Sequence, residues 1–171
     1  LERLHAPRLV FDGNGEAVPP AEKKKTAVFS AAGSGGAPEQ VNVDYPGATW
    51  LPARDVQLSE DWSRPPEEME AGEPVTRHVT LSALGQIETQ LPSLEAPDVD
   101  GLNAYSDQPE LVREIGSGGI RGVREDQYAI IGLAGGAVEL PAIEVPWWDL
   151  DAGEWKVASL PARTLTVRAA P

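Results

Sequence analysis

Apolar and polar residues alternate in several short segments of the chain. In residues 75–84, Val79, Leu81 and Ala83 fall on one face of an extended strand, and polar side chains fall on the other. This period of two is typical of an antiparallel strand with one buried face. No segment keeps the apolar period of an amphipathic helix for long, so the pattern predicts strands throughout.

Further apolar segments, separated by turn residues, predict a sandwich of short strands. Besides 75–84, the expected strands are 55–62, 102–106, 111–115, 120–133, 138–145, 155–158 and 164–167. Glycine turns at 116–119 and 135–136 are expected to close hairpins, the second of which would pair 120–133 with 138–145. The proline-rich residues 90–97 are expected to cross from one sheet to the other. Many short strands with frequent turns are typical of a β-sandwich, so we expect residues 47–171 to form an immunoglobulin-like domain.

Residues 1–46 differ from the rest of the chain. Their strand candidates are 8–12, 25–31 and 40–45, too few for an independent core. We therefore expect the C-terminal strands of a preceding β domain, followed by a linker. The chain starts at Leu1 rather than Met, which indicates a piece excised from a longer protein. Free edges of such a truncated domain would pair between chains and give a homodimer that depends on where the chain is cut.

Composition narrows the range of partners. The 171 residues carry a net charge of −13, whereas nucleic-acid binding needs clustered lysine and arginine. The chain has no cysteine, which excludes disulfides and zinc–thiolate sites. No apolar run approaches the roughly 20 residues that a membrane-spanning helix needs, so we expect no direct membrane insertion by this chain.

No residue pattern predicts catalysis or a cofactor. The glycines of 116–122 lack the Gly-Lys-Ser/Thr ending of a phosphate-binding loop, so a hairpin is expected there. His5 and His78 lie in separate segments, and no Gly-x-Ser-x-Gly elbow offers a nucleophile. We therefore expect a protein that is not an enzyme. The acidic turns at 149–154 and 12–16 leave calcium-dependent adhesion open, although both lack the complete calcium-loop pattern.

Two adjacent tryptophans at the end of a predicted strand are the most distinctive feature of the chain. Neighbouring residues of a strand face opposite sides, so only one of Trp147 and Trp148 can point into the core. The other is expected to be exposed, or to pack on Trp155 across the hairpin turn. Such packing stabilises a strand end without any ligand, whereas exposed aromatic side chains can anchor a protein partner. The predicted partner-binding residues are Trp147, Trp148, Asp149 and Trp155. A carbohydrate-binding module that stacks exposed tryptophans on sugars is the alternative.

Several motifs, in consistent order between residues 49 and 167, resemble those of the BatD (oxygen-tolerance, or aerotolerance) family. They are Trp50-Leu51-Pro52-Ala53-Arg54, Gly72-Glu73-Pro74-Val75-Thr76-Arg77, Gln90-Leu91-Pro92, Tyr105-x-Asp107-x-Pro109-Glu110, the run from Leu140 to Asp149, and Leu160-Pro161-Ala162-Arg163-Thr164-Leu165. Residues 1–48 match only loosely, as the end of a preceding domain.

This resemblance implies a location and a class of partner. BatD-like proteins carry a signal peptide, several immunoglobulin-like domains on the periplasmic side of the bacterial inner membrane, and a membrane anchor. They are encoded beside von Willebrand A-domain proteins (BatA, BatB) and a MoxR-type ATPase. The resemblance therefore implies a non-catalytic envelope scaffold linked to oxygen or stress tolerance. The chain would be a soluble periplasmic portion of such a protein.

Overall fold

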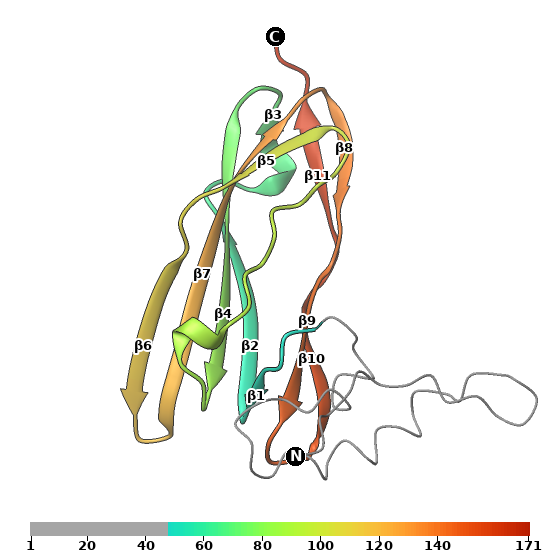
Figure 1. Cartoon of the computed structure of the whole chain (residues 1–171). Coiled ribbons are helices and arrows are strands. Elements are labelled where there is room, and N and C mark those ends of the chain that lie inside the picture. Colours follow the sequence, from blue (N-terminus) through green and yellow to red (C-terminus); the bar gives the residue numbers. More distant parts are fainter. Residues whose placement is uncertain (1–47) are drawn as a thin grey trace, which may run out of the picture.

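The computed structural model describes residues 48–171, which form two layers of β-sheet packed face to face (Figure 1). The first sheet runs in the order β2 (Asp55–Trp62), β4 (Pro74–Leu84) and β7 (Gly119–Gly132). Two shorter strands, β5 (Leu102–Ser106) and β6 (Glu110–Gly116), follow each other along the outer edge of β7. The domain expected in residues 1–46, with its strand candidates, lies outside the described residues.

The second layer consists of two small sheets placed end to end. At one end, β9 (Ile143–Asp149) lies between β1 (Pro52–Ala53) and β10 (Glu154–Leu160). At the other end, β11 (Arg163–Arg168) lies between β3 (Met69–Glu70) and β8 (Gly136–Leu140). Two short 3-10 turns, η2 (Pro66–Glu68) and η3 (Glu88–Gln90), complete the described elements. No helix in residues 48–171 is long and apolar enough to cross a membrane.

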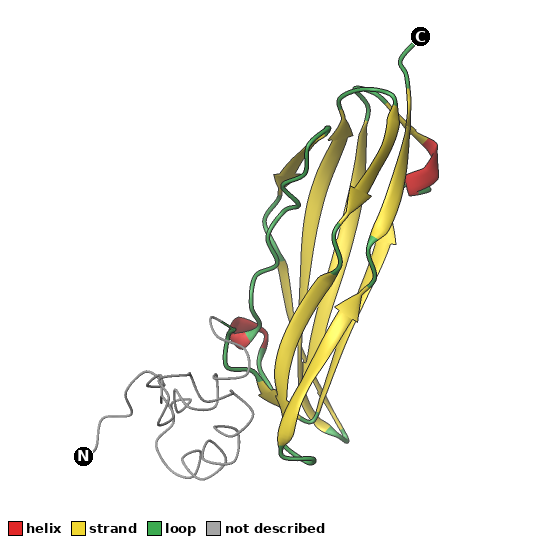
Figure 2. Cartoon of the chain, turned by 90° about the vertical axis from the view of Figure 1, so that its right-hand side faces the viewer, coloured by secondary structure: helices red, strands yellow, loops and turns green. Residues whose placement is uncertain are grey.

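The two small sheets are halves of one long hairpin that is interrupted at a single level. Leu140 is paired with Arg163 before the break, and Ile143 with Leu160 after it. The residues left between these pairs are Pro-Ala dipeptides on both strands, 141–142 and 161–162. Proline has no N–H to donate to the ladder, so two prolines at the same level end the pairing there. Figure 2 shows the two breaks beside each other in the layer that faces the viewer.

The all-β sandwich predicted from the sequence is confirmed. β2 and β5 occupy the expected residues 55–62 and 102–106, and β4 shows strict alternation of buried and partly exposed side chains. The hairpin expected at 116–119 joins β6 to β7. The strand expected at 138–145 is wrong in one respect, since the proline break divides it between β8 and β9.

The hairpin expected at Gly135–Gly136 is also wrong. β7 belongs to the first sheet, whereas β8 pairs with β11 in the second layer. The turn therefore carries the chain from one sheet to the other. Glycine is needed here for close approach, because a Cβ at Gly132 would lie 2.6 Å from a methyl group of Val167, and one at Gly135 would lie 2.9 Å from the backbone N of Ala169.

The proline-rich segment 90–97 does not cross between the sheets, contrary to the expectation. It connects β4 to β5, and both strands belong to the first sheet. The segment instead runs along the open side of the sandwich, where Leu91 joins the core, and Leu94 and Ala96 pack against it. The Tyr128 hydroxyl donates a hydrogen bond to the Leu94 carbonyl at 2.5 Å, which fixes the segment to β7.

Apolar side chains form two clusters along the sandwich, one at each end. The cluster at the β3–β11–β8 end contains Met69, Val75, Val79, Leu102, Tyr128, Ile130, Leu140, Leu160, Leu165 and Val167. The cluster at the β1–β9–β10 end contains Leu51, Ala53, Val56, Leu81, Ala83, Leu91, Val145, Trp147 and Ala158. Each cluster takes residues from both layers, so burial of apolar surface holds the layers together at both ends.

An ionic cluster around a buried Glu60–Arg77 pair connects the two layers near the proline break. Glu60 of β2 accepts a hydrogen bond from Nε of Arg77 at 2.8 Å and two from Arg163 of β11, at 3.0 and 2.6 Å. The Glu60 and Arg77 side chains are 7% and 2% exposed. Trp62 donates its indole N–H to the same carboxylate at 3.2 Å and lies under the Arg77 guanidinium, 5.3 Å from ring centroid to Cζ. We call Glu60, Arg77 and Arg163 the ionic cluster.

The charges of this cluster control the ionisation of Glu60. Burial by itself would raise the pKa of the Glu60 carboxyl, but hydrogen bonds and charges from Arg163 and Arg77 outweigh it and lower the pKa below its ordinary value. A carboxyl with a lowered folded-state pKa contributes stability that is fully present above its unfolded-state pKa, about 4.3. This contribution is lost as the pH falls through the folded-state pKa.

We expect Glu60→Gln to lower the free energy of unfolding at pH 7 by about 3 kcal/mol, because it leaves the buried Arg77 guanidinium without its counter-charge. The matched control is Glu73→Gln, which removes an exposed ion pair with Arg64 and should change stability by less than about 1 kcal/mol. Urea denaturation measures both. The difference between wild type and Glu60→Gln should shrink below about pH 4.3, since acid neutralises the same carboxylate in the wild type. A difference that does not change with pH would contradict this account.

We expect Gly122→Ala to destabilise the fold by about 1–3 kcal/mol, because a new methyl group there would overpack a closed contact. A Cβ at Gly122 would lie 2.6 Å from the backbone N of Glu88 and from the carbonyl carbon of Ile87, which are backbone atoms that must move. Gly116→Ala is the control, since nothing lies within 4 Å of a Cβ at that position. Thermal and urea unfolding should show a lower midpoint for Gly122→Ala alone.

Candidate interaction surfaces

The two adjacent tryptophans point to opposite sides of β9, as the strand geometry predicts. Trp147 belongs to the apolar cluster at the β1–β9–β10 end and is 6% exposed. Trp148 points to the outer side of the layer and is directly opposite Trp155 of β10 in the ladder. Of the two arrangements expected for the outward-facing tryptophan, exposure or packing on Trp155, the structure shows the packing on Trp155.

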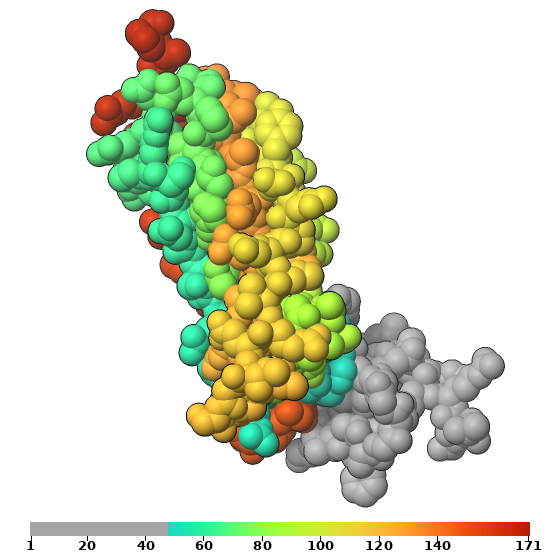
Figure 3. All heavy atoms as spheres, turned by 90° about the vertical axis from the view of Figure 1, so that its left-hand side faces the viewer, coloured from blue at the N-terminus to red at the C-terminus, as the bar shows by residue number. Residues whose placement is uncertain are grey.

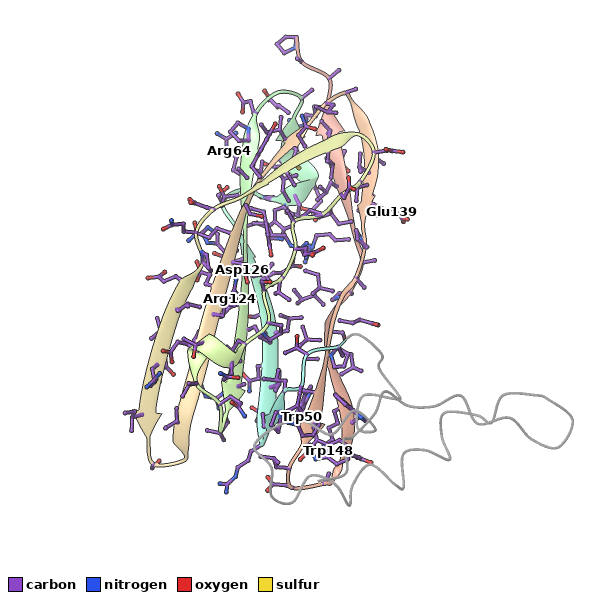
Figure 4. The ribbon with its side chains drawn as sticks, in the orientation of Figure 1. Trp50, Arg64, Arg124, Asp126, Glu139 and Trp148 are labelled. Atoms are coloured by element: carbon purple, nitrogen blue, oxygen red, sulfur yellow. The ribbon has the colours of Figure 1, made fainter. Side chains whose placement is uncertain are left out.

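A third tryptophan completes an indole cluster, which we define as Trp50, Trp148 and Trp155. The three ring centroids lie 5.8–5.9 Å apart, with interplanar angles of 37°, 79° and 86°. The two contacts of Trp155 are edge-to-face, an arrangement that stabilises aromatic groups beyond the area they bury. Trp148 and Trp155 are 6% and 7% exposed. Figure 4 shows Trp50 and Trp148 side by side at the end of the sandwich opposite the C-terminus.

Asp149 organises the turn that follows these tryptophans. Its carboxylate accepts hydrogen bonds from the backbone N–H groups of Asp151 and Ala152, at 2.9 and 3.0 Å, and pairs with Lys156 at 2.6 Å. The hydrogen bond from Lys156, more than the backbone donors, holds the pKa of Asp149 below its ordinary value. Gly153 closes the turn with a φ of 65°. This carboxylate therefore serves the hairpin itself.

The four predicted partner-binding residues thus lie together at one end of the sandwich. Trp147 lies in the core, Trp148 and Trp155 belong to the indole cluster, and Asp149 holds the turn. Their contact with a protein partner stays a prediction. The possible calcium loop at 149–154 belongs to no group of three or more metal-binding side chains, and none is found within residues 48–171. The loop at 12–16 lies outside the described residues.

Charged and glycine-rich segments elsewhere in residues 48–171 show structural roles. His78 pairs with Glu125 at 2.9 Å on the outer face of the first sheet. Arg124 forms a double hydrogen bond with Asp126, at 2.9 and 3.0 Å, and the two labels lie together in Figure 4. Gly122 provides the space into which η3 packs. We find no nucleophile with an adjacent base among these contacts, as acyl or phosphoryl transfer would need.

A groove of about 360 Å³ opens between the segment 93–98 and residues 141–144, with Arg77 and Tyr128 among its lining residues. One guanidinium nitrogen of Arg77, Nη2, is buried and lies 2.8 Å from Glu60 without a hydrogen bond of good geometry. Three exposed carboxylates, Glu95, Asp98 and Glu144, also line the groove. Their negative charge opposes an anionic ligand that would approach Arg77.

The largest group of exposed apolar side chains lies on the β6–β7 hairpin, which sequence reasoning did not single out. All seven residues of β6 are exposed, and Leu111, Val112 and Ile115 are 42%, 43% and 80% exposed. Ile120 of β7, the ladder neighbour of Ile115, is 39% exposed. Within residues 48–171, β6 pairs with β7 alone, so its other edge has no strand beside it. Figure 3 faces this edge and shows the golden-yellow atoms of β6 across the front of the molecule.

One signal in the sequence could have identified this surface. Leu111 and Val112 are consecutive, which places an apolar side chain on each face of a strand. A strand whose outward face lies on the surface of the sandwich cannot bury both of these side chains. We define the exposed side chains of β6 together with Ile120 as the β6 surface.

We expect Trp148→Ala to lower the free energy of unfolding by about 3–5 kcal/mol, because the substitution removes a buried aromatic side chain. Near-ultraviolet circular dichroism should lose the signal from closely packed indoles at the same time. Tyr105→Ala, which removes an aromatic side chain that is 57% exposed, should leave stability nearly unchanged. An unchanged unfolding midpoint in Trp148→Ala would show that the indole cluster does not stabilise the fold.

Comparisons with known proteins add no identification to this geometry. No family model, curated protein or solved structure matches the chain. The structure establishes an all-β sandwich with a buried aromatic end and an exposed edge strand. The resemblance to the BatD family continues to depend on the sequence motifs alone.

Proposed function

We propose that this chain is a non-catalytic scaffold and protein-interaction module of a BatD-like envelope protein on the periplasmic side of the bacterial inner membrane. In this proposal its role is in oxygen or stress tolerance. It acts together with von Willebrand A-domain proteins and a MoxR-type ATPase. The motifs that resemble the BatD family supply the identity of these partners, and the fold supplies the surface.

The observation that carries the interaction role is the β6 surface. Exposed apolar side chains that occur singly are normal in a folded protein, whereas a group of them on one element marks a contact site. Four of the large exposed apolar side chains belong to one hairpin, and Ile115 is the most exposed of them. An unpaired strand edge beside them offers backbone hydrogen bonds to an incoming strand.

The interior of the sandwich suits a rigid support. Two apolar clusters and the ionic cluster hold the two layers together along the length of the sandwich. A rigid frame keeps the β6 surface in one conformation, which lowers the entropy that binding would cost. This arrangement supports a role in binding other proteins rather than in catalysis.

The indole cluster does not favour the carbohydrate-binding alternative. Stacking on a sugar requires exposed and coplanar rings, while Trp148 and Trp155 are buried and stand at 86° to each other. One binding experiment can test both candidate contact sites, the β6 surface and the predicted contact at Trp147, Trp148, Asp149 and Trp155.

We expect purified von Willebrand A-type domains encoded beside the gene to bind the full chain in a saturable calorimetric titration. Ile115→Lys should weaken this binding tenfold or more, because it places a charge in the centre of an apolar contact. Leu133→Lys is the control, since it changes a side chain that is 55% exposed and lies outside the β6 surface. Trp148→Phe tests the indole cluster in a variant that keeps an aromatic ring. Absence of binding at several hundred micromolar would rule out these partners.

A further inference from the structure

β6 has the features of a strand that is completed by another strand. Natural sheets protect an exposed edge with charged side chains, inward-pointing charges, proline or a bulge, or they cover it. β6 contains no proline and no bulge, and its seven residues form an uninterrupted ladder with β7 from Glu110 to Gly116. Its three charged residues are Glu110, Arg113 and Glu114, and the inward-pointing Arg113 is paired with Glu88 of its own chain. Its apolar side chains remain exposed although the strand is fully formed. A second strand beside β6 would bury these side chains and satisfy its free backbone edge.

The two faces of β6 differ in character. The inward face, which continues the core side of β7, carries Leu111, Arg113 and Ile115, because Arg113 is opposite the buried Gly122. Arg113 is already neutralised there, since Nε and Nη2 donate to the two carboxylate oxygens of Glu88 at 2.8 and 3.0 Å. The outward face carries Glu110, Val112 and Glu114.

A second copy of the chain can supply the missing strand only in a few registers. Two identical antiparallel strands in one continuous sheet are related by a twofold axis perpendicular to the sheet. This axis keeps each side chain on its own face, and because faces alternate along a strand, the axis must pass through a residue pair. The registers that overlap most of β6 are those centred on Val112, Arg113 or Glu114.

The side chains discriminate among these three registers. Centring on Val112 places Glu110 opposite Glu114, and centring on Glu114 places that glutamate opposite its own copy. Like charges directly opposite each other destabilise a sheet. Centring on Arg113 places Leu111 opposite Ile115 on both sides of the axis. In that register the arginines that meet at the axis each carry their own Glu88.

The Arg113 register also extends the apolar contact into β7. Ile120 is the ladder neighbour of Ile115 within one chain. A row of three apolar side chains therefore forms across the interface, from Ile120 to Ile115 to Leu111 of the second copy. The twofold axis repeats this row on the other side of Arg113. Cross-strand apolar pairs of this kind stabilise a sheet.

We propose that β6 pairs antiparallel with β6 of a second copy, centred on Arg113, and joins the first sheets of two chains into one continuous sheet. This inference rests on the proposed role of the β6 surface in protein contacts, and it assigns the free strand edge to a second copy of the chain instead of a von Willebrand A-type domain. Seven residues on each side make a small interface, so the dimer is weak and depends on concentration. The net charge of −13 on each chain opposes association, and salt that screens this repulsion should strengthen the dimer.

Sedimentation velocity of the full chain, from about 1 to 500 μM, tests the association. We expect a monomer–dimer equilibrium that shifts toward the dimer when sodium chloride is raised from about 0.05 to 0.5 M, since the Debye length shortens from over 10 Å toward a few ångströms. Ile115→Lys should remain monomeric throughout, and Leu133→Lys should dimerise like the wild type. A monomeric wild type at the highest concentration, or an Ile115→Lys dimer of unchanged affinity, would overturn the inference.

Cysteine cross-linking tests the register, and the absence of natural cysteine makes the result specific. Arg113→Cys places two thiols opposite each other at the axis, where mild oxidation should link the two chains rapidly. In Glu110→Cys the thiols would be separated by about six residues of strand, roughly 20 Å, and should not link. Equal cross-linking of both variants, or of neither, would reject this register.

The titration with von Willebrand A-type domains, done in parallel, separates the two proposals. A chain that dimerises without binding those domains would keep the inference and reject the proposed partners. A monomeric chain whose binding to those domains is lost in Ile115→Lys would keep the proposed function and reject the second copy as the partner of β6.

Discussion

The architecture depends on one carboxylate that two arginines from different layers share. Glu60 binds Arg77 within the first sheet and Arg163 across the sandwich, although Arg163 lies 103 residues later in the chain. Burial of the apolar clusters on either side holds the layers together, but this interaction is not directional. Hydrogen bonds to a single carboxylate fix the distance and alignment of the layers. The ionic cluster thereby fixes β11 against β2 at this level of the sandwich.

The proline break allows that contact to form. Leu-Pro-Ala occurs at residues 51–53, 140–142 and 160–162, and each leucine is buried, with exposures of 0%, 0% and 8%. In the second and third of these segments the leucine fills the core and the proline then ends the ladder. Arg163 follows the third segment directly and reaches inward to Glu60. Leu160 and Arg163 are three residues apart and would face opposite sides of an unbroken strand. The break between them allows both side chains to face the core.

Local pattern was sufficient to predict most strands but not their partners. The alternation in 75–84 and 55–62 identified β4 and β2, because a period of two is a property of one strand. The Gly135–Gly136 turn was assigned to a hairpin because a glycine pair between two strands is typical of hairpin turns. Glycine also permits a close crossing between sheets, and the sequence around the turn does not distinguish the two cases. The position of Glu60 on an apolar face was visible in the sequence. Its two arginines were not, since only the folded chain brings Arg163 to it.

The candidate sites show the same division. The pairing of Trp148 with Trp155 follows from a hairpin of known length, so it could be expected before the structure. The consecutive Leu111 and Val112 indicated one exposed apolar side chain. The joint exposure of Leu111 and Ile115 could not be expected, because it depends on β6 lying at an edge that no other described strand covers. Apolar strands in the middle of a sheet and at its margin have the same composition. Sheet order, which arises from contacts distant in sequence, decides between them.

The placement of β1 and β11 also has a mechanical consequence. The described chain enters through β1 near one end of the sandwich, and β11 leads out to the C-terminus at the opposite end (Figure 1). Tension between residues 48 and 171 would therefore act along β11 and against its neighbours β3 and β8. Hydrogen bonds perpendicular to the pull share the load and must break together, whereas bonds pulled open from one end break in sequence. A stretching force applied along the long axis would therefore load the ladders of β11 in shear.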